Sequence, residues 1–235
     1  PNLYGNTIFY NPQWSSNGDK LLVQGMIKQG QIGGLILYDI NTNKNTAVKV
    51  TKNTSIDEIN ELYRSFEYSN DEESIFYFSE DKRSIIKYDI KSKLETSIIS
   101  GTKTILFFKL SNDNTSLTFG YWCKDDNNLY TIPTNGGAKK KIMTFEENCD
   151  CSDNIIAWGK DDKYIYFKEG KFRDFDKIMR ISVDGGTPEE ILDFKTFVKN
   201  GTITKVNLHP DNNRIAFELQ IGKGEVWKLN GIFNE

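Results

Sequence analysis

The chain has 235 residues, of which 37% are hydrophobic, 13% aromatic and 27% charged, so it is long and apolar enough to bury a sizeable core. Its net charge of -3 gives no electrostatic basis for binding nucleic acid or anionic lipid, because both depend on clustered Lys and Arg. No window approaches about 18 consecutive apolar residues, so the sequence predicts no transmembrane helix and no integral membrane protein.

Apolar runs rich in β-branched and aromatic residues, separated by turn-forming residues, predict strands along the whole chain. They fall into five groups: 8–13, 21–23, 35–40 and 46–50; 62–66, 75–78, 85–90 and 95–99; 104–110, 117–121, 128–132 and 140–143; 154–158, 164–167, 177–182 and 189–192; 202–208, 214–218 and 225–229. The fifth group lacks a fourth strand. Either residues 1–4 supply it, or residues outside this sequence close the ring, or the ring is not closed.

One helix is expected between the first two groups. The segment 51–63 contains Ser55-Ile56-Asp57-Glu58, which has the form of a capping box, and Ile59 and Tyr63 follow Ile56 at helical spacing. The start of the chain, residues 1–5, lacks the basic and apolar parts of a signal peptide. Any export signal is therefore expected to have been removed or to lie outside this sequence.

A ten-residue stretch, 208–217, recurs as weaker copies that start at residues 14, 68, 110 and 158, so the steps are 54, 42, 48 and 50 residues. Each copy begins with a large apolar residue, and we expect Trp14 and Trp158 to be core residues. A short polar side chain follows three positions later and is expected to stabilise a turn by bonding nearby backbone; these residues are Asn17, Asp71, Asp113, Asp161 and Asp211. Each copy is therefore a predicted hairpin.

Four-stranded units at this period predict an all-β fold, a β-propeller of four-stranded blades. A β-sandwich is disfavoured because it would not need the same turn at the same strand position in every unit. We expect one propeller domain over residues 1–235, with repeats at about 7–51, 62–100, 104–144, 153–193 and 202–233.

Recognition is expected at one rim of this scaffold. The turns between the first and second and between the third and fourth strands are short, whereas the loops on the opposite rim are long and dissimilar, and variable loops on a rigid scaffold commonly bind partners. Aromatic and arginine side chains anchor many interfaces. On that rim the candidate ligand-binding residues are Trp122, Lys124 and Asp125 beside Tyr121, and Phe172, Arg173 and Asp174. The alternative is that Trp122 packs a strand end and the charges are solvated, as we expect for Lys139-Lys140-Lys141.

Catalytic and metal-binding patterns are weak. The single histidine, His209, occupies a turn position, and no nucleophile elbow, phosphate loop or dinucleotide fingerprint is present, so no catalytic residue and no cofactor is expected. Adjacent acids such as Asp161-Asp162 fit turns better than an acid–base pair. The segment 146–153 has a metal-like composition without the ligand spacing of a known site, so no metal is expected.

The chain has three cysteines, Cys123, Cys149 and Cys151. Cys123 and Cys149 are expected on the same rim, where a disulfide between them is one hypothesis.

The repeat resembles the TolB-like propeller family, whose units read roughly W-S-P-D-G, then I-A-F, then I-Y-x-x-D and a Gly-Gly turn. The residues that carry this resemblance are His209-Pro210-Asp211 with Ile215-Ala216-Phe217, Trp14-Ser15-Ser16-Asn17-Gly18, and Val183-Asp184-Gly185-Gly186. The proline position is filled by Ser16, Asn70, Asn112 and Lys160 in the other copies. Six-bladed rings are usual in this family, so the resemblance implies that five repeats form part of a six-bladed ring.

What the resemblance implies for function is a bacterial, exported domain of the periplasm or cell surface that binds a protein or glycan partner. With no catalytic constellation in view, we expect a monomeric, non-catalytic binding module and no enzyme. Any membrane association would come through a segment outside this sequence. The alternative is the propeller portion of a larger peptidase, or of a sensor or signalling receptor, that gates access or senses a ligand. Direct enzymatic action, as in propeller lyases or glycosidases, is the third hypothesis.

Overall fold

The computed structural model describes residues 9–28, 32–52, 65–121, 126–145, 155–171, 174–196, 198, 202–209, 214–221 and 223–230. Nearly all of them lie in strands or tight turns, and Phe194–Thr196 forms a single 3-10 turn. The chain divides into two compact units, residues 1–102 with 134–136, and residues 103–133 with 137–235.

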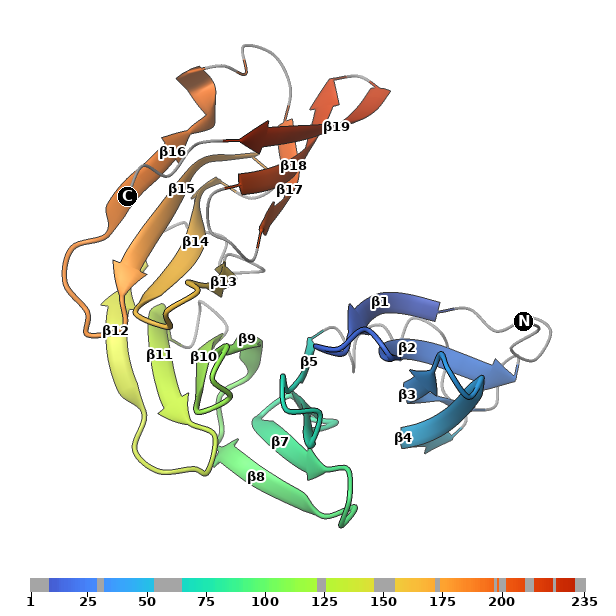
Figure 1. Ribbon diagram of the computed structural model, residues 1–235. Helices are drawn as coiled ribbons and strands as arrows, with labels where there is room; N and C mark the ends of the chain where they lie inside the picture. Colours follow the sequence, from blue (N-terminus) through green and yellow to red (C-terminus); the bar gives the residue numbers. More distant parts are fainter. Residues whose placement is uncertain are drawn as a thin grey trace. The chain divides into compact units, whose positions relative to one another are not determined.

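Five antiparallel sheets, here called blades 1 to 5, follow one another along the chain, and strands that are adjacent in sequence are paired in each blade (Figure 1). Their bounds are as follows: blade 1, β1 (Phe9–Trp14), β2 (Lys20–Lys28), β3 (Ile32–Asp39) and β4 (Lys44–Lys52); blade 2, β5 (Phe66–Tyr68), β6 (Ser74–Phe78), β7 (Ser84–Asp89) and β8 (Glu95–Ser100); blade 3, β9 (Ile105–Leu110), β10 (Ser116–Tyr121), β11 (Asn128–Pro133) and β12 (Lys140–Thr144); blade 4, β13 (Ile155–Trp158), β14 (Tyr164–Lys171), β15 (Asp174–Ser182) and β16 (Glu189–Asp193); blade 5, β17 (Thr202–Leu208), β18 (Arg214–Ile221) and β19 (Lys223–Asn230).

This order confirms the predicted all-β fold and the predicted grouping of strands. The fifth blade has three strands among the described residues, as expected. Two differences stand out. β2 was predicted at 21–23 but extends to Lys28, and β5 was predicted at 62–66 but runs from Phe66 to Tyr68, with 62–64 outside the described residues. The predicted helix at 51–63 and all three cysteines also fall mostly or wholly outside the described part of the chain. Within that part, no helix is long and apolar enough to span a membrane.

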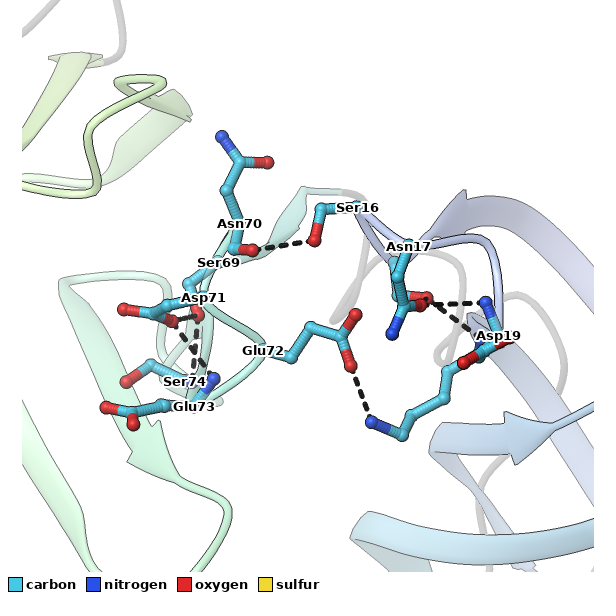
Figure 2. Close-up of polar contacts among 11 residues, drawn as sticks. Ser16, Asn17, Asp19, Ser69, Asn70, Asp71, Glu72, Glu73 and Ser74 are labelled. Carbon is cyan, nitrogen blue, oxygen red and sulfur yellow. Dashed lines mark hydrogen bonds and ion pairs between the residues drawn. The ribbon is translucent and has the colours of Figure 1, made fainter.

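The repeated turn has the predicted structural role. In blade 2 the Oδ1 atom of Asp71 accepts hydrogen bonds from Ser69 Oγ at 2.5 Å and from the Glu73 N–H at 3.0 Å (Figure 2). Ser69 Oγ in turn accepts the Ser74 N–H at 2.9 Å. The turns at Asn17, Asp113 and Asp161 repeat the bond from the backbone two residues on. Each of these four hairpins is therefore closed by a short polar side chain that accepts backbone donors of the turn.

The same turn also occurs on the opposite rim of blade 2, between β6 and β7. Asp81 Oδ1 accepts bonds from Ser79 Oγ at 2.6 Å and from the Arg83 N–H at 3.0 Å, and Ser79 Oγ accepts the Ser84 N–H at 3.0 Å. The prediction that the loops on this rim are long and dissimilar is therefore wrong for 79–84, which is a short turn of the repeated type. The cause is visible in the sequence, where Ser-x-Asp-x-x-Ser appears at 69–74 and again at 79–84.

Glycine occupies the positive-φ position of the turn between β15 and β16. Gly185, between β15 and β16, has φ of 91°, and a Cβ atom there would lie 3.2 Å from the backbone oxygen of Ile142 in the preceding blade. Both the conformation and the close approach favour glycine. This confirms the predicted Gly-Gly turn.

Apolar cores lie between consecutive blades within each unit. In unit 1, Leu22 and Leu35 of blade 1 pack with Phe66, Ile75 and Tyr77 of blade 2. In unit 2, one cluster joins blades 3 and 4, and a second joins blades 4 and 5; their main members are Leu106, Leu129, Ile142, Trp158, Ile165 and Phe167 in the first, and Tyr166, Ile178, Ile203, Ile215 and Phe217 in the second. Burial between neighbours explains why single blades need partners.

The two tryptophans in the repeated apolar position have different surroundings. Trp158 is 7% exposed and its indole N–H donates to the Lys109 oxygen of blade 3 at 3.1 Å. Trp14 is 62% exposed, so the prediction that it is a core residue is wrong. The repeat pattern identifies the position in the blade, but burial of that position also requires a neighbouring surface, which blade 3 provides for Trp158.

Polar contacts join the turns of consecutive blades. Ser16 Oγ donates to the Asn70 oxygen at 2.7 Å and Lys20 pairs with Glu72 at 2.5 Å (Figure 2). In unit 2 the Asn112 N–H donates to Asp162 Oδ1 at 2.8 Å. Asp162 therefore serves a turn, as predicted, and also links that turn to the preceding blade.

Candidate functional site

The structure leaves the six predicted ligand-binding residues untested. Trp122, Lys124 and Asp125 lie in the segment 122–125, outside the described residues, and Phe172 and Arg173 are also outside them. Asp174 begins β15, where its backbone pairs with Lys171 at the end of the β14–β15 hairpin. These assignments therefore remain predictions.

The residues on either side of the segment 122–125, Tyr121 and Asp126, are described, and both make contacts within blade 3. Tyr121 ends β10 and Asp126 lies two residues before β11. Asp126 is the more buried anchor, because its side chain is only 8% exposed. Its Oδ2 atom lies 2.9 Å from Lys103 Nζ and accepts the Tyr130 hydroxyl at 2.9 Å, while Oδ1 accepts the Asn128 N–H at 3.2 Å. The carboxylate thus ties the start of β11 to the residues just before β9.

The charge state of Asp126 is fixed by these donors. Burial works to raise the pKa of this carboxyl, but the hydrogen bonds from Lys103, Tyr130 and Asn128 outweigh it and hold the pKa below its ordinary value. The same contact raises the pKa of the Lys103 ammonium. Burial, and then Asp126, raises the pKa of the Tyr130 hydroxyl. Asp126 and Lys103 are therefore an ion pair at neutral pH, with Tyr130 as a neutral donor.

The other end of the segment, Tyr121, is held by aromatic and cationic contacts. Its ring packs edge-on against Phe119 at 5.5 Å and against Tyr130 at 5.8 Å, between ring centroids. The Lys139 ammonium donates to the Tyr121 hydroxyl at 3.1 Å and lies 4.6 Å from the centroid of Tyr121 and 4.2 Å from that of Tyr130. Cation–π contacts of this kind fix a ring in place.

Lys139 shows where the sequence interpretation of the lysine run was incomplete. The run 139–141 was expected to project into solvent, yet Lys139 lies across two tyrosine rings and Lys140 pairs with Asp184 at 2.9 Å. Lys103, Tyr130 and Lys139 were not predicted as site residues. Of the residues that make these contacts, the sequence pointed only to Tyr121 and Asp126, because they flank the predicted segment.

Metal-ligating side chains and the single histidine can be placed among the described residues. Among them no group of three or more His, Cys, Asp or Glu side chains could hold a metal ion. The His209 N–H donates to the Arg214 oxygen at 2.9 Å, which is the bond that closes its hairpin. His209 therefore has the predicted turn role.

Comparison with known proteins shows what the arrangement resembles. No protein-family model and no curated protein matches the sequence. Among solved structures, the chain is similar to an oligogalacturonate lyase from Vibrio parahaemolyticus, with 17% identity, a TM-score of 0.66, and coverage of 98% of this chain and 66% of that one. It is similar to TolB from Acinetobacter baumannii, with 13% identity, a TM-score of 0.66, and coverage of 96% and 52%. It is also similar to a prolyl endopeptidase, with 12% identity, a TM-score of 0.64, and coverage of 96% of this chain and 34% of that one.

The chain spans about two thirds of the lyase and about half of the TolB structure. These matches correct one prediction. The absence of a recognised catalytic motif led to the prediction that the chain is not an enzyme, and the similarity to a lyase and an endopeptidase overturns it, because the same propeller architecture occurs in enzymes. At these identities the similarity concerns the fold: the chain has a β-propeller fold of the TolB-like type.

Proposed function

We propose that this propeller recognises a protein or glycan partner through the segment 122–125 of blade 3, with Phe172, Arg173 and Asp174 of blade 4 as further contacts. The observation that carries the proposal is that the residues flanking 122–125 are held in place, Asp126 by Lys103 and Tyr130 and Tyr121 by Lys139. Recognition sites depend on supporting contacts of this kind beside the residues that touch the partner.

The residue types in this segment suit recognition. Trp122 offers a large amphipathic surface, and Lys124 and Asp125 offer a charge of each sign. Tryptophan and arginine are among the commonest energetic anchors of interfaces.

We further propose that the protein is exported by a bacterium to the periplasm or cell surface, where it acts as a monomer. The TolB-like fold supports this location.

A glycan array and a pull-down from extract would test the proposal, using wild type, Trp122→Ala and Arg173→Ala. Trp14→Ala is the matched control, because Trp14 is an exposed tryptophan in another unit. We expect Trp122→Ala to lose at least about tenfold in affinity and Trp14→Ala to lose none. Equal retention of every partner by Trp122→Ala would contradict the proposal. Each bound glycan should also be checked for cleavage, because similar structures include a lyase.

A second candidate function is the propeller portion of a larger peptidase or of a sensor. It is favoured by one observation: 96% of this chain matches 34% of a prolyl endopeptidase. The reading frame that encodes the chain tests this candidate. A peptidase, kinase or DNA-binding segment beside the propeller would support it, and a signal peptide with no second domain would support the first proposal.

A further inference from the structure

Unit 1 contains a groove that the loop proposal does not use. It encloses about 430 Å³ and its lining comes from the outer strand of blade 1 and from blade 2. Blade 1 contributes Lys49 of β4, and blade 2 contributes the β6–β7 turn, β6, β7 and Glu95 at the start of β8. A volume of this size falls in the range of roughly 300–1,000 Å³ that is typical of ligand sites.

The charged residues in the lining are mostly acidic. Glu80, Asp81 and Glu95 contribute three carboxylates and Lys49 contributes one ammonium, so the lining carries a net charge of -2. Lys82 and Arg83 follow in the same turn but are not part of the lining. Glu80 is exposed at the turn, and Asp81 is held in place by the turn bonds described above. The β6–β7 turn therefore holds the carboxylate of Asp81 in place and exposes that of Glu80.

One cation already occupies part of this groove. Lys49 Nζ lies 2.7 Å from Glu95 Oε1 and 5.9 Å from the centroid of the Tyr77 ring. Lys49 is also the main reason that the pKa of Glu95 lies below its ordinary value. The aromatic ring and the carboxylate together form a site that stabilises a positive charge.

We propose that this groove binds the lysine or arginine side chain of a partner protein. The carboxylates of Glu80 and Glu95 would pair with the cationic head, and Ile86 and the ring of Tyr77 would line the alkyl stem. Lys49 then competes with the partner's cation for Glu95. The lining contains only residues of unit 1 and none of the segment 122–125, so either proposal can fail without the other.

The experiment measures fluorescence anisotropy of a fluorescein-labelled Gly-Ser peptide with two central arginines, against the same peptide with two central glutamines. We expect wild type to bind the arginine peptide and not the glutamine peptide, with affinity falling as salt rises. Glu95→Gln and Glu80→Gln should each weaken binding by about fivefold, the scale of a partly exposed ion pair. Glu73→Gln removes an exposed carboxylate elsewhere in unit 1 and should leave affinity unchanged.

Lys49→Gln should change the affinity for the arginine peptide in the opposite direction. It removes the competing ammonium, so the arginine peptide should bind more tightly than to wild type, and this result cannot arise from a loss of folding. Equal affinity for the arginine and glutamine peptides, no binding of either, or equal effects of Glu95→Gln and Glu73→Gln would each overturn the proposal. Trp122→Ala should bind the arginine peptide like wild type, which separates this site from the proposed loop site.

Discussion

Two Lys–Asp ion pairs in unit 2 have the same length but different burial, and they make a matched test of the anchor at Asp126. Lys103–Asp126 and Lys140–Asp184 both measure 2.9 Å from Nζ to the carboxylate. The Asp126 side chain is 8% exposed, whereas that of Asp184 is 89% exposed. We predict that Asp126→Asn destabilises the protein and that Asp184→Asn does not.

The magnitude follows from the donors that each carboxylate serves. Asn at 126 can still accept the Asn128 N–H, but it leaves Lys103 without its charge partner and weakens the bond from Tyr130. Loss of a buried, charge-assisted bond costs about 2 kcal/mol, whereas an exposed ion pair contributes about 0.5 kcal/mol or less.

Urea unfolding at pH 7, followed by far-UV circular dichroism, measures both effects in the same unit. With a slope of about 2 kcal/mol/M, Asp126→Asn should lower the unfolding midpoint by roughly 1 M, and Asp184→Asn should leave it nearly unchanged. Equal shifts for the two variants, or a shift for Asp126→Asn within error of zero, would refute the reasoning that burial makes Asp126 an anchor.

Three further contrasts follow from the structure. Trp158→Ala should cost about 3–5 kcal/mol and Trp14→Ala less than about 1 kcal/mol in urea unfolding, and similar costs would contradict the assigned burial. The buried Tyr68 hydroxyl has no hydrogen-bond partner among the described residues, so Tyr68→Phe should leave stability unchanged or raise it by up to about 1 kcal/mol, whereas Tyr130→Phe should lower it by about 1 kcal/mol. The pKa of Asp126 in the folded state lies below the unfolded value of about 3.9, so its contribution to the free energy of unfolding is complete above that pH and is lost as the pH falls through the folded pKa. The difference in stability between wild type and Asp126→Asn should therefore be smaller at pH 3 than at pH 7. The same difference at both pH values would count against the ion pair.

The sequence was informative wherever a local pattern sets local structure. The polar side chain at Asp71 and its equivalents predicted each hairpin, because a short acceptor three residues after a strand end stabilises a turn through bonds only two residues apart. The runs of apolar, β-branched and aromatic residues on either side then located each strand, with bounds that differ by up to five residues at β2. The fold could therefore be predicted from repetition of one local motif.

Contacts between distant residues could not be predicted in this way. Lys103 and Asp126 are 23 residues apart, and their pairing depends on how the first and third strands of blade 3 are placed. The exposure of Trp14 and the burial of Trp158 differ for the same reason, since the pattern does not say what covers a position. The tight turn at Ser79 was not predicted, although its motif is visible in the sequence. The prediction for this loop rested on which rim it lies on and not on its residues.

The most direct test of the proposed recognition site is hydrogen exchange, measured by mass spectrometry, on the protein with and without a partner captured by the array or pull-down. We expect peptides covering 121–126 to become protected on binding, whereas peptides covering the β13–β14 turn at 159–163 should stay unchanged. Binding without any added protection at 121–126 would show that the partner is held elsewhere and would contradict the assignment of this segment.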